Sequence, residues 1–100
     1  MQIRNSSITF SPHNGSGPVQ QTEDIVFTNP ITKVATILTG MNVEFSHGND
    51  HHLGNLQVSV NGLILNSTTV RVTATFGLRD WSGDWDDDYD GQILFSVIGE

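Results

Sequence analysis

The chain has 100 residues, of which 36% are hydrophobic, and eleven acidic against four basic residues give it a formal net charge of −7. This length and composition predict one globular domain with a modest core, and the charge argues against nucleic acid or anionic membranes as partners. The absence of cysteine excludes disulfides, thiolate nucleophiles and cysteine-ligated zinc.

Period-two alternation of apolar and polar residues recurs along the chain without a sustained helical period, which predicts an all-β domain. A loop rich in proline, glycine and serine at 11–18 follows the first strand, and Asn29-Pro30 ends the second. Gly40 is predicted to mark a bend or bulge in the third strand, and Asn61-Gly62 a turn after the fourth. The six expected strands cover about residues 2–10, 24–28, 31–45, 56–60, 69–76 and 93–98.

The last two predicted strands indicate how the core is built. The inward side chains of the fifth strand are expected to be Val70, Val72, Ala74 and Phe76. The last strand is apolar at nearly every residue from 93 to 98, as in a strand buried on both faces or covered by a neighbouring subunit. Six short antiparallel strands bury their apolar faces by closing into a sandwich or a small barrel. We expect residues 1–100 to form a single six-stranded antiparallel β-sandwich.

Residues 80–91 hold six of the eleven acidic residues, both tryptophans and the only tyrosine. Like charges held side by side gain little stability, and aromatic rings on a loop forgo burial. This composition therefore predicts a site for a cation, a polar ligand or both. Trp81 and Trp85 are each either a stacking platform for a sugar ring, or a lid on the sandwich or a subunit contact. Tyr89 has the same alternatives.

Part of this segment has the spacing of the first half of a calcium-binding loop, D-x-D-x-D-G. The twelfth position of such a loop is Val97, within a predicted strand, so the segment is not an EF-hand. A non-helical calcium site, closed by Asp80, Asp84 or backbone carbonyls, and a solvated acidic turn are the two alternatives. The expected calcium ligands are Asp86, Asp88, Asp90 and the carbonyl of Gln92.

Two further groups of polar residues have a functional and a structural interpretation. Residues 46–52 hold three of the four histidines, and His47 with His51 or His52, plus Asp50, supplies ligand types suited to zinc or nickel. The alternative is a solvated loop. Arg71 and Arg79 are expected to pair with the acidic segment, or to form salt bridges on the surface or at a subunit interface.

The order of these elements resembles the H-type lectin domain, a small six-stranded β-sandwich found in snail agglutinins, the discoidins and various microbial proteins. The similarity covers about residues 24–98. It is carried by the segment Ile-Val-Phe-Thr-Asn-Pro at 25–30, Val-Ala-Thr-Ile-Leu at 34–38, Asn-Leu-Gln-Val at 55–58, Thr-Val-Arg-Val at 69–72, and Trp81 ahead of the final apolar strand.

This resemblance implies a trimer, sometimes paired into a hexamer, that binds galactose or N-acetylgalactosamine in clefts between subunits. In that family the site uses an acidic residue of the N-terminal region, an arginine on the fourth strand and a Trp-His pair in the last loop. Here Gln57 stands in the place of the arginine, Trp81 in that of the tryptophan and Ser82 in that of the histidine. The exact sugar is therefore left open.

The leading hypothesis is an oligomeric carbohydrate-binding module that acts by multivalent capture, with calcium as an optional cofactor. Its sugar-binding residues are expected to be Trp81, Asp80, Ser82, Asp84, Gln57, Trp85 and Tyr89. The alternative is a structural or assembly subunit of a larger particle or appendage that uses the sandwich to oligomerise. Catalysis is not expected, because an aspartate-rich turn gives its carboxylates no contrasting environments.

The N-terminal residues lack the apolar core of a signal peptide, and no apolar run approaches the length of a membrane span. We therefore expect a soluble protein made in the cytosol. Release or surface display by another route is left open.

Overall fold

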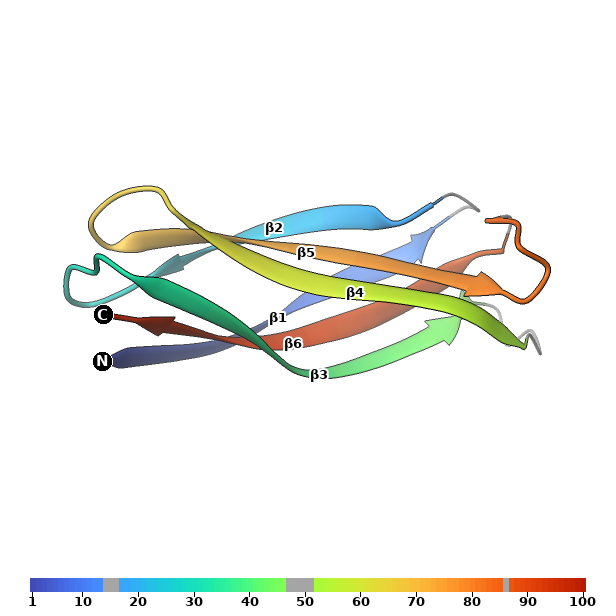
Figure 1. The fold of residues 1–100 in the computed structure, drawn as a ribbon, viewed down its shortest axis with the longest axis horizontal. Helices are drawn as coiled ribbons and strands as arrows, with labels where there is room; N and C mark the ends of the chain where they lie inside the picture. The colour runs from blue at the N-terminus through green and yellow to red at the C-terminus, as the bar shows by residue number, and fades with distance from the viewer. Residues whose placement is uncertain (14–16, 47–51, 86) are drawn as a thin grey trace.

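Six antiparallel strands form two three-stranded sheets in the computed structural model of the chain (Figure 1). The structure describes residues 1–13, 17–46, 52–85 and 87–100. The strands are β1 (Gln2–His13), β2 (Val19–Val26), β3 (Val34–Phe45), β4 (Leu53–Ile64), β5 (Thr69–Asp80) and β6 (Tyr89–Gly99). These residues include no α-helix, and so no helix that could cross a membrane. The prediction of a six-stranded all-β sandwich is confirmed.

Each sheet has one central strand that supplies most of the core. The β6 sheet has the order β1-β6-β3, and the β5 sheet has the order β2-β5-β4. The four predicted inward residues of β5, from Val70 to Phe76, are fully buried, as are Ile93, Phe95 and Val97 of β6. The strands run along the long axis of a body of 47 × 19 × 18 Å, and both termini lie at one end of it (Figure 1).

Most strands are longer than their apolar patterns indicate. The second strand was expected at 24–28, but β2 begins at Val19 and ends at Val26. Its polar half pairs with threonines of β5, for example Gln20 with Thr75, so backbone pairing rather than alternation defines it. The third strand was expected from 31, but β3 begins at Val34. Ile31 instead turns into the core and donates its N–H to the carbonyl of Ser67 at 2.7 Å.

The turn predicted at Asn61-Gly62 is wrong, because both residues lie inside β4 and pair with β5. A Cβ atom at Gly62 would lie 2.8 Å from Cγ2 of Thr36, so glycine there lets β3 and β4 approach closely across the sandwich. The chain turns farther on. There Asn66 Oδ1 accepts hydrogen bonds from the backbone N–H groups of Thr68 and Thr69 at 3.0 and 2.9 Å.

The irregularity predicted at Gly40 is confirmed, because the register between β3 and β6 shifts between Leu38 and Gly40. A second shift, between Phe10 and His13 of β1, occurs nearer the start of β6, beside Tyr89 to Gly91. The β6 sheet is therefore irregular on both sides of its central strand. The shift in β1 borders a hollow on the outer face of this sheet.

The prediction that the last strand is buried on both faces is wrong for the chain by itself. Leu94 is 39% exposed on the outer face of β6, and Ile98 is half-buried there. Ile98 lies near the end of the sandwich that holds the termini, and it pairs with Ile3 of β1 and Ala35 of β3. These two neighbours add exposed apolar side chains to the same face. We call this surface the aliphatic patch, and its members are Ile3, Ala35, Ile37, Leu94 and Ile98. Coverage by a neighbouring subunit stays a prediction.

Candidate functional site

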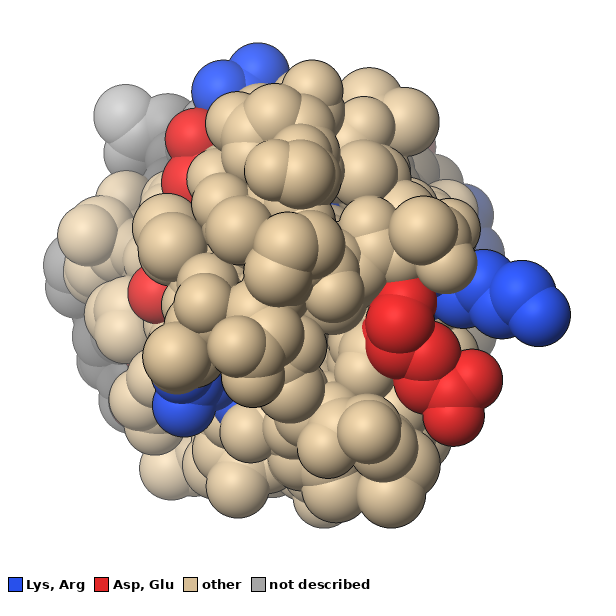
Figure 2. Space-filling view, turned by 90° about the vertical axis from the view of Figure 1, so that its left-hand side faces the viewer, with Lys and Arg blue, Asp and Glu red and all other residues tan. Residues whose placement is uncertain are grey.

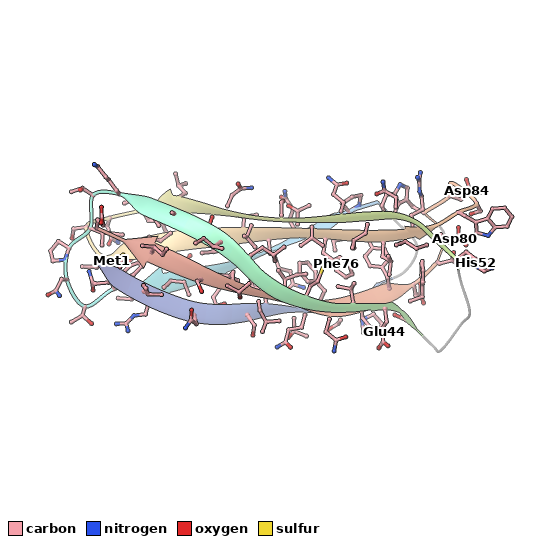
Figure 3. All side chains as sticks on the ribbon, turned by 60° about the horizontal axis from the view of Figure 1, so that its bottom comes forward. Met1, Glu44, His52, Phe76, Asp80 and Asp84 are labelled. Carbon is pink, nitrogen blue, oxygen red and sulfur yellow. The ribbon has the colours of Figure 1, made fainter. Side chains whose placement is uncertain are left out.

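The acidic and aromatic segment lies at the end of the sandwich opposite the termini. Figure 3 shows Asp80, Asp84 and His52 at this end and Met1 at the other. Seen from the terminal end, the surface carries only a few scattered charged side chains (Figure 2). Asp80, Asp84 and His52 therefore form a polar surface at the end of the body opposite the termini.

The turn after β5 is held by its own side chains. Asp80 is 8% exposed, and its Oδ1 accepts hydrogen bonds from the Ser82 N–H at 3.0 Å and from the Ser82 hydroxyl. Gly83 has a φ of +89°, which glycine adopts without strain. The Arg79 guanidinium donates to the Gly83 carbonyl at 3.3 Å. These contacts fix the backbone around the exposed Asp84.

Trp81 projects from this turn with 74% of its surface exposed. Its backbone N–H donates to the carbonyl of His52 at 3.0 Å, and its ring meets the His52 ring edge-on at 6.4 Å. A rigid backbone thus carries a large aromatic face that the protein does not bury. Such a face is suited to stacking on an apolar ring surface.

Gly54 is a positioning residue that the sequence did not reveal. It lies where the register of β4 against β5 shifts, between Leu53 and Asn55. A Cβ atom there would lie 2.1 Å from the carbonyl oxygen of Asp80 and 2.8 Å from Cα of Trp81. Only a glycine lets β4 pass this close to the turn. An alternation broken at His52-Leu53-Gly54 was the one signal in the sequence.

Tyr89 is part of the core, so its interpretation as a sugar-stacking surface is wrong. The residue is 1% exposed, and its hydroxyl donates to the carbonyl of Gly17 at 2.8 Å. Burial raises the pKa of this hydroxyl. The ring is in edge contact with Phe76 at 5.1 Å and with Trp85 at 6.4 Å. Tyr89 therefore anchors the start of β6 to the core.

Trp85 connects this core to the surface. Its ring is half-buried against the core, and the Arg79 guanidinium lies 5.6 Å from the ring centre. This cation–π contact holds the middle of the acidic segment against the end of β5. The position fits the interpretation of Trp85 as a lid on the sandwich, while part of the ring still reaches the surface.

Gln57 is exposed on the outer face of the β5 sheet and is not brought next to Trp81. It pairs with Gly77, four residues before Trp81 along the chain, a distance of roughly 13 Å in a strand. One sugar ring does not bridge these two positions. A longer chain of sugars along the end of β4 does.

Three of the four expected calcium ligands, Asp88, Asp90 and Gln92, lie in the described part of the chain. Asp90 and Gln92 lie on the outer face of β6, and the Asp88 carbonyl accepts a hydrogen bond from the Ser46 N–H at 2.9 Å. Asp86 lies outside the described residues. Within residues 1–13, 17–46, 52–85 and 87–100, no three histidine or acidic side chains are grouped so as to hold a metal ion. Calcium binding by this segment stays a prediction.

The remaining polar predictions have different outcomes. Arg71 forms a salt bridge with Asp24, its cross-strand neighbour, at 2.9 Å. The prediction that Arg71 pairs with the acidic segment is therefore wrong, and the alternative, a surface salt bridge, is confirmed. The hydrogen bond from Arg71 lowers the pKa of the Asp24 carboxyl. His47, Asp50 and His51 of the predicted zinc or nickel site lie outside the described part of the chain.

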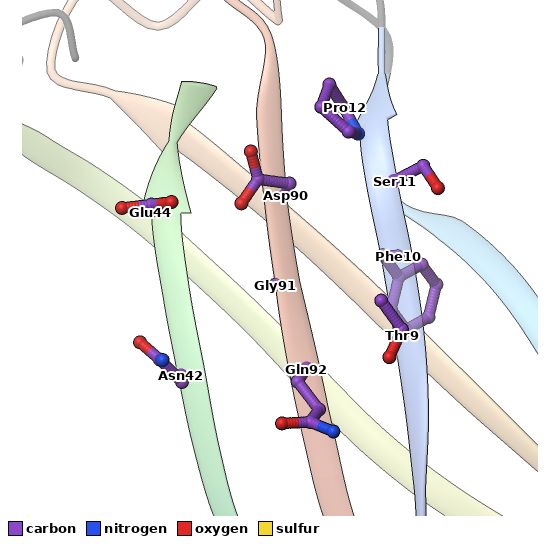
Figure 4. A pocket seen from close by; sticks show the side chains of 9 residues that line it. All are labelled: Thr9, Phe10, Ser11, Pro12, Asn42, Glu44, Asp90, Gly91 and Gln92. Atoms are coloured by element: carbon purple, nitrogen blue, oxygen red, sulfur yellow. The ribbon is translucent and has the colours of Figure 1, made fainter. Parts of the chain in front are cut away.

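A second polar feature lies on the outer face of the β6 sheet at the same end. A hollow of about 490 Å³ crosses β1, β6 and β3 (Figure 4). Sequence reasoning singled out Asp90 and Gln92 there, but only as calcium ligands. It missed the neighbours that pairing brings beside them, because Thr9, Asn42 and Glu44 belong to distant segments of the chain.

No protein-family model, curated protein or solved structure matches the chain. The two polar features and the exposed aliphatic patch are therefore the parts of the molecule that indicate a function.

Proposed function

We propose that the protein is a non-enzymatic carbohydrate-binding module whose ligand stacks on Trp81. One observation carries the proposal: the Trp81 ring is 74% exposed on a turn held by Asp80, Gly83 and the His52 carbonyl. A tryptophan face stacks on the C–H surface of a sugar, and a turn that is already rigid loses little conformational entropy on binding.

Polar groups beside the ring supply hydrogen bonds to sugar hydroxyls. Ser82 and Asp84 are exposed next to Trp81, while the buried Asp80 carboxylate acts by holding the turn. Gln57 contacts only a ligand longer than one ring. The proposal also draws on the resemblance of the order of elements to the H-type lectins, with Trp81 ahead of the last strand. In this proposal calcium assists through Asp86, Asp88, Asp90 and the Gln92 carbonyl.

The direct test is Trp81→Ala in a glycan array followed by titration of the best hit. Loss of a central stacking ring is expected to weaken binding by about 2 kcal/mol, or roughly thirtyfold. The melting temperature should stay within a few degrees, because the ring is mostly exposed. Leu63→Ala, at an exposed apolar residue near the end of β4 that lies away from the Trp81 turn, is the matched control. Equal glycan binding by both variants would refute this site.

Calcium is tested separately by titrating the ion into chelator-treated protein. Saturable binding, and glycan hits that appear only with the ion, would make calcium part of the site. Glycan hits that survive chelation would leave Trp81 and its polar neighbours as a metal-independent site.

The aliphatic patch favours a second function, that of an assembly subunit. Exposed aliphatic side chains that pair across three neighbouring strands leave an apolar surface that association would bury. A homo-oligomer, a trimer or hexamer by resemblance, would also raise avidity for a multivalent glycan. Assembly and glycan binding therefore need different surfaces of the same chain and can be tested independently.

A further inference from the structure

The hollow on the outer face of the β6 sheet has the volume of a ligand site and a mainly polar lining. Its volume of about 490 Å³ falls within the range of ~300–1,000 Å³ typical of small-molecule pockets. The irregularity of β1 forms one wall, because Ser11 and Pro12 lie where the register shifts between Phe10 and His13. Gly91 also lines the hollow, between Asp90 and Gln92 in the central strand.

Strand pairing arranges the polar side chains of the hollow in two rows. Thr9 of β1 and Asn42 of β3 both pair with Gln92 of β6. One row across the sheet therefore holds the Thr9 hydroxyl, the Gln92 amide and the Asn42 amide, in that order. Asp90 pairs with Glu44 in the next outward-facing row. Strands are ~4.8 Å apart, so each full row spans about 10 Å, which suits a single sugar ring with its substituents. Figure 4 shows these side chains along the three strands.

Two of these groups are held in place and two are available to a ligand. The Ser46 hydroxyl donates to Oδ2 of Asp90 at 2.8 Å, and the Gln92 amide donates to the Ser7 hydroxyl at 3.2 Å. These bonds orient the Asp90 carboxylate and the Gln92 carbonyl oxygen. In the described part of the chain, the Glu44 carboxylate and the Asn42 amide have no hydrogen-bond partner.

The negative charge of the hollow indicates which class of ligand suits it. Glu44 and Asp90 are the charged residues of its lining, and two carboxylates in directly opposed strand positions repel each other. Among the described residues, no basic side chain forms an ion pair with either of them. A cationic group between them would relieve this repulsion. The neutral amides and the hydroxyl in the next row suit hydroxyl groups on the same ligand.

We propose that this hollow binds an amino sugar with a free ammonium group. Glu44 and Asp90 accept hydrogen bonds from the ammonium, while Asn42, Gln92 and Thr9 bind ring hydroxyls. The site extends the proposed carbohydrate binding to a second place on the chain and a second class of saccharide. It does not use Trp81, so either site can fail without the other.

The test is calorimetric titration of the full chain with a glucosamine disaccharide and with its N-acetylated counterpart, at low salt and in the presence of a chelator. The free amine should bind at least tenfold more tightly, and added salt should weaken it. Glu44→Gln should reduce its affinity about tenfold or more, because a charge-assisted hydrogen bond is lost. Glu100→Gln removes the same charge at the terminal end of the molecule and should change nothing.

Trp81→Ala should leave binding of the free-amine disaccharide intact. Three results would each overturn the proposal: equal affinity for the acetylated disaccharide, undiminished binding by Glu44→Gln, or equally tight binding of spermidine, which would indicate unspecific attraction to negative charge. Loss of neutral glycan binding in Trp81→Ala, with amino-sugar binding retained, would support two separate sites. Loss of both ligands in Trp81→Ala would count against a separate hollow site.

Discussion

The Tyr89 hydroxyl links the beginning of β6 to the connection between β1 and β2. It donates a 2.8 Å hydrogen bond to the Gly17 carbonyl, while the ring lies against Phe76 and Trp85. Tyr89→Phe keeps the ring and removes this hydrogen bond, which is expected to lower the free energy of unfolding by about 1 kcal/mol. Urea denaturation measures the change. Glycan binding at the exposed Trp81 should be preserved, in keeping with a structural role.

Tyr89 also gives the protein a predictable loss of stability at alkaline pH. Burial raises its pKa above the ordinary value of 10.0, so the folded state holds this proton more tightly than the unfolded state. The resulting stability is present below pH 10 and is lost as pH rises through the higher, folded-state pKa. Denaturation measured between neutral pH and pH above 10 should show a smaller decline for Tyr89→Phe. An equal decline in both proteins would contradict this assignment.

Strand β4 determines where the Trp81 turn lies, because Gly54 passes directly beneath it. Alanine at this position would place Cβ 2.1 Å from the Asp80 carbonyl oxygen, and that atom belongs to the backbone and moves only with the turn. Gly54→Ala is therefore expected to displace Trp81 and to weaken glycan binding about tenfold, with a loss of stability of ~1–3 kcal/mol.

Gly40→Ala is the matched control for this substitution. It also lies at a register shift, but its nearest neighbour would be Cβ of Leu94 at 4.0 Å, an ordinary contact. It should fold and bind normally. Intrinsic tryptophan fluorescence and glycan titration of the two variants distinguish displacement of the turn from a general effect of alanine in an irregular strand.

The strands with clear apolar alternation could be predicted from the sequence, and the polar ones could not. Alternate residues of β5 are apolar, and this pattern predicts its core residues. The predicted range of the second strand, 24–28, misses the first half of β2, because Gln20 to Glu23 carry no such pattern. Their strand conformation comes from backbone pairing with Thr73 and Thr75, which is a property of the folded sheet. The turn at Asn61-Gly62 was wrong for a related reason, since this glycine serves packing rather than chain reversal.

The candidate site was predicted in part for similar physical reasons. The acidic segment and Trp81 are close in sequence, so composition alone singled them out. The burial of Tyr89 depends on Phe76 and Gly17, and the grouping of Glu44 with Asp90 depends on the register of β3 against β6. Contacts between distant segments are set by pairing, which local sequence patterns do not encode.

At the scale of the whole molecule, the acidic end and the aliphatic patch divide the surface by chemistry. The formal charge of −7 opposes self-association in general, but the patch lies away from the acidic end and holds no charged residue. The patch covers only part of a face of 47 by 19 Å, so an interface centred on it would bury less than that whole face.

Self-association through this patch would make the sedimentation mass of the protein depend on its concentration and on Leu94. Sedimentation of the wild-type chain should give a multiple of 10.9 kDa at micromolar concentration. Leu94→Asp places a charge within the patch and should shift the protein toward the monomer, because an unpaired charge in an interface is costly. Leu63→Asp adds the same charge to an exposed leucine of the β5 sheet and should not.

The same pair of variants separates assembly from ligand recognition. A monomeric Leu94→Asp should bind a monovalent glycan as the wild-type protein does, but should bind an immobilised multivalent surface about 10²-fold more weakly, because avidity is lost. A wild-type chain that sediments at 10.9 kDa at every concentration would remove the patch as a self-association surface. Glycan binding at Trp81 would then act one site at a time, since its turn is built within a single chain.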